Sequence, residues 1–192
     1  MKSLKNLKKI KGDASFREFY RNKKNKSILV LSKKEKLKNL LIYDAINKIL
    51  IKNNIIAPKL LNQNYYKNFI EIEDLGNQTI YKRLKKSDKD QYQIFKKIVK
   101  TLNKIQLIKD KKIKNFKNKF YKIKDYKNKF LLDEAKLFNV WYAKKKLTQK
   151  KLKLFNKKFN KEIKFLLSKL NYKNITFVHR DFHVSNLIIT SN

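Results

Sequence analysis

The 192-residue chain contains no cysteine, one proline and two glycines. The lack of cysteine excludes a disulfide scaffold, a catalytic thiolate and any cysteine-ligated zinc site. No stretch approaches the ~18 uninterrupted apolar residues that a transmembrane helix needs. The basic N-terminus also lacks the apolar core of a signal peptide. We therefore expect a cytoplasmic protein that makes no contact with a membrane.

Acidic residues are also scarce, since 15 Asp and Glu face 51 Lys and Arg, which gives a net charge of +36. Such a charge invites a role in nucleic-acid binding. Phosphate-binding surfaces usually use the planar fork of arginine, but only four of the basic residues are arginines, and the lysines spread along the whole chain. The excess of Lys, Asn and Ile resembles the drift of an AT-rich genome. We interpret the charge as a solvated surface and do not expect a nucleic-acid partner. A basic nucleic-acid-binding protein without catalysis stays the alternative.

Hydrophobic residues make up 42% of the chain, which is typical of a globular protein. The apolar periodicity predicts an α+β fold, in which the first ~75 residues mix short strands with one helix and the rest is mainly helical up to a final strand. The expected strands are residues 27–32, residues 69–73, an apolar strand within residues 174–181 that leads into a polar loop, and residues 186–190. The expected helices are residues 34–54, 88–106 after a Ser87 cap, with a buried stripe of Phe95, Ile98, Val99, Leu102 and Ile105, and 149–170 after a Thr148 cap.

The stretch from His179 to Asn186 carries the densest set of reactive side chains. His179, Arg180, Asp181 and Asn186 spell H-R-D-x-x-x-x-N, the catalytic-loop pattern of kinase-like phosphotransferases. In that pattern the Asp meets the acceptor hydroxyl, and the Asn five residues later reaches back to a Mg²⁺ ion on the nucleotide phosphates. The alternative is structural: His179 would be a satisfied core histidine and Asp181 would cap a turn.

Two earlier stretches fit a nucleotide site. In "KGDASFREFYRN", residues 11–22, the small residues suit a loop whose backbone N–H groups approach phosphates. In "IEIEDLGNQTIYKRL", residues 70–84, the segment Glu73–Gly76 fits a hinge whose backbone groups hydrogen-bond an adenine. The structural alternatives are a polar turn between two strands and an edge strand that stops at a glycine.

Taken in this order, the three stretches resemble the aminoglycoside phosphotransferase/choline kinase superfamily. The D-A-S-F-R segment is most similar to bacterial anomeric sugar kinases acting on N-acetylmuramate and N-acetylglucosamine. The resemblance implies a bilobal protein-kinase-like fold, with a nucleotide-binding lobe of sheet and one helix over residues 1–76 and a helical lobe with the catalytic loop over 77–192. It also implies transfer of the ATP γ-phosphate to a sugar hydroxyl of an amino sugar in cell-wall recycling, with a choline or aminoglycoside acceptor as the alternative.

The resemblance assigns roles to individual residues. Asp181 would be the catalytic base, His179 would brace the loop, and Asn186 would be a ligand of Mg²⁺. The expected ATP-binding residues form two groups, the phosphate-covering Gly12, Asp13, Ala14, Ser15, Phe16 and Arg17 and the hinge residues Glu73, Asp74, Leu75 and Gly76.

Two features depart from the pattern of the superfamily. The interior of the first expected strand, Ile28 to Leu31, lacks the phosphate-clamping Lys, and we assign no Lys–Glu pair. The pattern also places a second metal-binding Asp on the strand after the catalytic loop, whereas this chain ends six residues after Asn186. We therefore expect a C-terminally truncated fragment with impaired activity.

Overall fold

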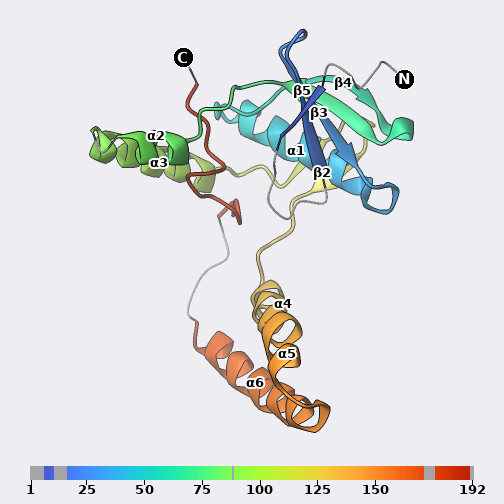
Figure 1. Ribbon diagram of the computed structural model, residues 1–192, viewed down its shortest axis with the longest axis vertical. Coiled ribbons are helices and arrows are strands. Elements are labelled where there is room, and N and C mark those ends of the chain that lie inside the picture. The colour runs from blue at the N-terminus through green and yellow to red at the C-terminus, as the bar shows by residue number, and fades with distance from the viewer. Residues whose placement is uncertain (1–6, 11–16, 88, 171–175, 191–192) are drawn as a thin grey trace. The chain divides into compact units, whose positions relative to one another are not determined.

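The computed structural model describes residues 7–10, 17–87, 89–170 and 176–190. The chain divides into two compact units (Figure 1). The first unit comprises residues 1–123 and 176–192, and the second comprises residues 124–175. The described residues of the predicted site all belong to the first unit. Helices and an antiparallel N-terminal sheet together confirm the predicted α+β class.

The first unit is built on a five-stranded antiparallel sheet with the strand order β1-β2-β3-β5-β4. The strands are β1 (Leu7–Ile10), β2 (Arg17–Asn22), β3 (Ser27–Ser32), β4 (Leu60–Asn64) and β5 (Phe69–Glu73). β3 and β5 have the predicted bounds, and they pair with Val30 opposite Ile70. Both of these side chains are fully buried, as expected for β-branched residues at the centre of a half-covered sheet.

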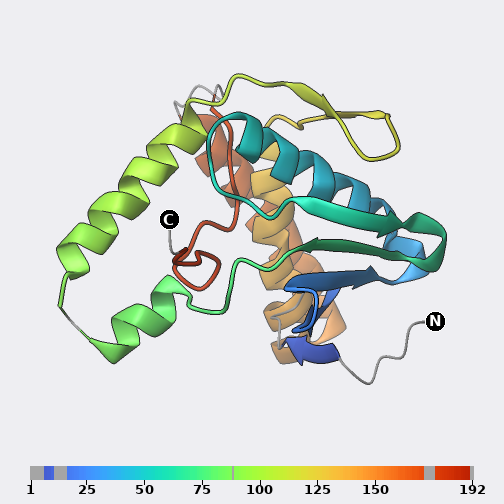
Figure 2. The same ribbon diagram turned by 90° about the horizontal axis from the view of Figure 1, so that it is seen from above.

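Helix α1 (Lys38–Lys52) covers one face of this sheet (Figure 2). It confirms the predicted helix, except that the first expected turn is a separate 3₁₀ turn, Lys34–Lys36. Leu40 of α1 is fully buried and packs in one cluster with β3 and β5. The apolar stripe of α1 is therefore the main contact that holds the helix on the sheet.

A second apolar cluster joins α1 to the segment that leads into the H-R-D motif. Ile49 of α1 and Ile105 pack there with Phe177, and all three are buried. Because Phe177 lies two residues before His179, this cluster fixes where the motif begins.

Two helices follow the sheet, α2 (Ile80–Lys86) and α3 (Gln91–Gln106). The sequence did not predict α2. The predicted Ser87 cap of α3 is wrong, because the Ser87 hydroxyl accepts the Lys89 N–H (3.1 Å) in a turn before the helix starts. The predicted stripe of α3 is only partly buried: Ile105 is buried, but Phe95 and Val99 are 47% and 53% exposed.

The sequence pattern predicted no structure for residues 114–130. The start of this segment belongs to a hairpin of β6 (Lys112–Lys114) and β7 (Phe120–Lys122). The second unit then consists of α4 (Asn128–Phe138), a π-helical turn (Asn139–Ala143), α5 (Lys144–Lys146) and α6 (Gln149–Lys169). Helix α6 begins after Thr148 as predicted, but the Thr148 side chain forms no capping hydrogen bond. Phe138 of α4 stacks with Phe159 of α6 at a centroid distance of 6.0 Å. Across the described ranges, no helix is both long and apolar enough to cross a membrane.

The two predicted C-terminal strands are wrong within the described residues. Thr176 to Asp181 is irregular, and from 186 to 190 only Ile188 makes a β-bridge, with Thr79. For the second of these strands the physical reason is its partner, because backbone groups of Val184, Leu187 and Ile189 bond to residues 78–81 at the start of α2 instead of to the edge of a strand.

Candidate active site

The loop that carries the H-R-D motif is attached to the N-terminus of α2 (Figure 2). The first N–H groups of a helix have no acceptor within the helix. Here the Ile80 N–H donates to the Leu187 carbonyl (2.9 Å) and the Tyr81 N–H to the Val184 carbonyl (3.1 Å). The Ile189 N–H donates in turn to the Gln78 carbonyl (2.8 Å). These backbone bonds fix the loop independently of its side chains.

The loop brings together the predicted catalytic base and the predicted metal ligand. Nδ2 of Asn186 donates to Oδ2 of Asp181 (2.7 Å) and to the Asp181 backbone carbonyl (3.1 Å). Among the described residues nothing donates to the Asn186 amide oxygen, so this oxygen is available to a cation. The Asp181 side chain is 71% exposed, so a hydroxyl group can reach it from solvent.

His183 completes this cluster, and the sequence interpretation missed it. Its Nε2 lies 3.1 Å from Oδ1 of Asp181 and 3.1 Å from Nδ2 of Asn186. Both oxygens of the Asp181 carboxylate therefore have a neighbour in the loop. The signal in the sequence was the resemblance itself, since His183 is a fixed position of the H-R-D-F-H-x-x-N segment that the chain shares with the superfamily, although no role was assigned to it.

His179 is half-buried and forms no hydrogen bond with the described residues of this cluster. Its ring makes an edge-on contact with Phe182 at 5.5 Å, and within the described residues its Nδ1 has no hydrogen-bond partner. Burial lowers the pKa of His179, an effect that the negative charge of Asp181 opposes. The next residue, Arg180, has a φ of 70°, a left-handed conformation that turns the chain between His179 and Asp181. A bracing role for His179 remains a prediction.

We expect acid to destabilise the chain partly through His179. Its pKa is lower in the folded state than in the unfolded state, so the unfolded state binds protons more readily once the pH falls below the ordinary histidine value of about 6.5. The stabilising effect of the neutral ring is complete above that value and is lost below it. Urea unfolding at about pH 7.5 and about pH 5.5 should show a smaller loss of stability in His179→Phe than in the wild type. Equal losses would contradict a buried, neutral His179.

The predicted hinge follows β5 directly. The Glu73 N–H donates to the Lys59 carbonyl (2.9 Å), and the Gly76 N–H donates to Oδ1 of Asp74 (2.9 Å). Gly76 has a φ of 97°, which only glycine adopts without strain. Within the described part of the chain, the backbone N–H and carbonyl of Leu75 have no hydrogen-bond partner, so they are the hinge groups open to a ligand.

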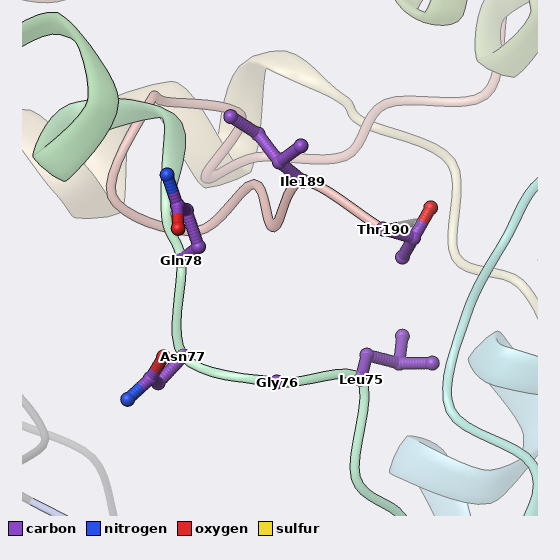
Figure 3. A pocket seen from close by; sticks show the side chains of 6 residues that line it. All are labelled: Leu75, Gly76, Asn77, Gln78, Ile189 and Thr190. Atoms are coloured by element: carbon purple, nitrogen blue, oxygen red, sulfur yellow. The ribbon is translucent and has the colours of Figure 1, made fainter. Parts of the chain in front are cut away.

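A pocket of about 370 Å³ lies between this hinge and the segment after the catalytic loop (Figure 3). This volume falls in the range of small-molecule sites. Figure 3 shows the hinge side of the pocket facing its C-terminal side. Its lining residues are Leu75, Gly76, Asn77, Gln78, Ile189 and Thr190.

The remaining predicted residues concern the phosphates. Gly12 to Phe16 lie outside the described residues, and Arg17 is the first residue of β2, with its guanidinium 4.8 Å from the centre of the Tyr43 ring. Burial lowers the pKa of Arg17. The buried carboxylate of α1 belongs to Asp44, which pairs with Lys48 on the same helix (2.9 Å). Asp44 is therefore not the acidic residue of a phosphate-clamping pair with a lysine of β3.

The residues present fit a divalent cation only in part. The amide oxygen of Asn186 and the adjacent Asp181 carboxylate are oxygen ligands of the kind that Mg²⁺ prefers. In the ranges that the structure describes, however, no three His, Cys, Asp or Glu side chains form a metal-binding group.

A loop with the H-R-D-x-x-x-x-N pattern next to a pocket, in a unit built on an antiparallel sheet with one helix, is the arrangement expected of a small-molecule phosphotransferase. The sequence model of the phosphotransferase enzyme family matches residues 6–192. The chain belongs to this family, and membership implies ATP-dependent phosphorylation of a small molecule with a divalent metal. No curated protein and no solved structure matches the chain significantly.

Proposed function

We propose that the chain transfers the γ-phosphoryl group of ATP to a sugar hydroxyl, and that the acceptor is an amino sugar of cell-wall recycling such as N-acetylmuramate. The contact between Asp181 and Asn186, anchored on the same short segment that lines the hinge pocket, is the observation that carries the proposal. The D-A-S-F-R segment, Asp13 to Arg17, supports a sugar acceptor by its resemblance to anomeric sugar kinases.

In this proposal, Asp181 receives the acceptor hydroxyl and orients or accepts its proton. One oxygen of the Asp181 carboxylate therefore has to lose its contact within the loop and accept a hydrogen bond from that hydroxyl. Oδ1 is the oxygen that exchanges more easily, because its contact with His183 (3.1 Å) is longer than the contact of Oδ2 with Asn186 (2.7 Å). Asn186 thus keeps the carboxylate oriented while the acceptor binds.

The nucleotide is proposed to bind with its base in the hinge pocket and its phosphates toward the catalytic loop. The backbone N–H and carbonyl of Leu75 offer one donor and one acceptor to the edge of an adenine. Residues 12–17 cover the phosphates, and Asn186 holds Mg²⁺ through its amide oxygen. When bound, Mg²⁺ neutralises the charge that develops on the phosphates. The division into a nucleotide-binding lobe, 1–76, and a helical lobe, 77–192, is part of the same proposal.

A radiochemical assay tests the acceptor. The chain is incubated with γ-labelled ATP, Mg²⁺ and one acceptor at a time: N-acetylmuramate, N-acetylglucosamine, choline or an aminoglycoside. We expect labelling of the two amino sugars alone, because phosphoryl transfer depends on positioning of the acceptor hydroxyl by the loop. Labelling of choline or the aminoglycoside instead would reject the sugar acceptor.

The same assay without an acceptor measures hydrolysis of ATP and serves as the background. Labelling of an amino sugar that does not exceed this background, in a chain that binds ATP, would contradict the proposed function itself.

A further inference from the structure

Arg21 of β2 forms a closed set of hydrogen bonds with the hinge. Its Nε donates to Oδ2 of Asp74 (2.6 Å) and its Nη2 to Oδ1 (3.0 Å), so the ion pair is bidentate. The same Nη2 donates to the Gly76 carbonyl (2.8 Å). The ring closes through the Gly76 N–H, which donates to Oδ1 of Asp74 (2.9 Å). Arg21 and Asp74 are separated by 53 positions in the sequence.

This ion pair differs from ordinary surface pairs in its burial and geometry. The side chains of Arg21 and Asp74 are only 20% and 13% exposed, so solvent and salt screen them weakly. A planar guanidinium that binds a carboxylate through two parallel N–H groups fixes orientation as well as distance. Across the described residues, no other side chain forms a hydrogen bond with Asp74 or Gly76.

The pair holds the residues on both sides of Leu75. Asp74 precedes Leu75 and is bound through its side chain, while Gly76 follows it and is bound through its carbonyl and its N–H. Leu75 itself keeps its backbone polar groups free and lines the pocket. Fixing the two neighbours restricts the rotation of both peptide groups of Leu75, so their N–H and carbonyl point in set directions.

We infer that Arg21 is a positioning residue for the nucleotide base: without touching the ligand, it orients the Leu75 backbone in the hinge pocket by holding Asp74 and Gly76. The inference rests on the proposed function, since it assumes that the pocket binds the adenine of ATP. It also links the hinge to β2, the strand that begins directly after the segment proposed to cover the phosphates.

The test compares ligands that carry different parts of ATP. Binding of adenosine, ATP and inorganic tripolyphosphate is measured by calorimetry for the wild type, Arg21→Lys and Arg21→Gln. Arg21→Lys keeps the charge but loses the fork. We expect adenosine and ATP to bind at least about tenfold more weakly to both variants, since charged hydrogen bonds that order the site are lost. Tripolyphosphate should bind as it does to the wild type, because its site does not include the hinge.

Two further variants keep the test independent of folding. Arg21→Gln combined with Asp74→Asn leaves no unpaired buried charge and should fold, yet it should still bind adenosine weakly. Lys9→Gln breaks the exposed Lys9–Glu18 pair (3.2 Å) of the same sheet, and it should leave binding of all three ligands unchanged. Hydrogen exchange at the Gly76 amide should become faster in the Arg21 variants only.

The outcomes separate the inference from the proposed function. A wild type that binds no adenosine and no ATP would overturn both. A wild type that binds them, with Arg21→Lys binding them equally well, would overturn the role of Arg21 alone. Equal weakening of adenosine and tripolyphosphate in the Arg21 variants would show a general structural effect and would likewise overturn the positioning role.

Discussion

Replacing Asp181 with asparagine should lower the rate of phosphoryl transfer by about 10²–10⁴-fold, the range for loss of a positioned acid or base. The side chain keeps its shape but loses the charge that accepts or orients the proton of the acceptor hydroxyl. The substitution also replaces the carboxylate that accepts the Asn186 Nδ2 hydrogen bond with a neutral amide, which weakens this 2.7 Å contact. The rate of label transfer from ATP to the amino sugar measures the effect, and the dissociation constant of ATP should not change.

A matched control is available in Asp125→Asn. Asp125 belongs to the second unit, its side chain is 52% exposed, and its nearest cation, Lys127, is 4.0 Å away. This substitution removes the same charge without touching the loop, so the rate should stay at the wild-type value. An Asp181→Asn variant that transfers phosphate as fast as Asp125→Asn would remove Asp181 from the catalytic role.

Replacing Leu40 with alanine should lower the free energy of unfolding by about 2–5 kcal/mol, as for other fully buried leucines. Leu40 is 0% exposed and lies between α1 and the two central strands, in contact with the cluster of Val30 and Ile70. Truncation leaves a cavity that the rigid sheet cannot fill. Urea denaturation followed by circular dichroism measures the loss.

The control for this prediction is Leu61→Ala on β4. Leu61 is 56% exposed, so its truncation should change the free energy of unfolding by no more than about 0.5 kcal/mol. If both alanine variants lost stability to the same degree, the packing of α1 on the sheet would not be the main source of stability in the first unit.

The helices and strands that could be predicted from sequence are those whose secondary structure is determined by their own residues. β3 and β5 were predicted to the residue, because short apolar runs with strong β-formers bury one or both faces of a strand. The centre of α1 was equally clear, since Leu40, Ala45 and Ile49 repeat at helical spacing and all become buried.

The elements that were missed depend on partners distant in sequence. The apolar run from Ile175 to Val178 has the composition of a strand, but in its described part Phe177 packs against helices, and its backbone enters no ladder. Helix α2 is only seven residues long, and its N-terminus is completed by a loop more than 100 residues later. Intrinsic helix and strand propensities depend on the local sequence, so they contain no information about partners distant in sequence.

In the candidate site, too, contacts between residues near in sequence could be predicted, and contacts between distant residues could not. The spacing of Asp181 and Asn186 was enough to predict that their side chains converge, because a loop with four intervening residues brings them to the same place. Arg21 could not be found in this way. Nothing near Arg21 in the sequence points to Asp74, and the segment containing Asp74 suggested only backbone contacts with a base. The ion pair depends on the strand order β2-β3-β5, in which the Arg21 side chain reaches past β3 to the residue that follows β5.

The bonds between the catalytic loop and α2 make the order of the loop depend on a single helical turn. Residues 78–81 supply the backbone groups that hold both Val184 and Leu187–Ile189, and the same segment continues from the hinge. Fraying of this turn, which is among the least costly openings of a folded chain, releases the loop and one wall of the pocket together. We therefore expect the loop with the H-R-D motif and this wall of the pocket to open together.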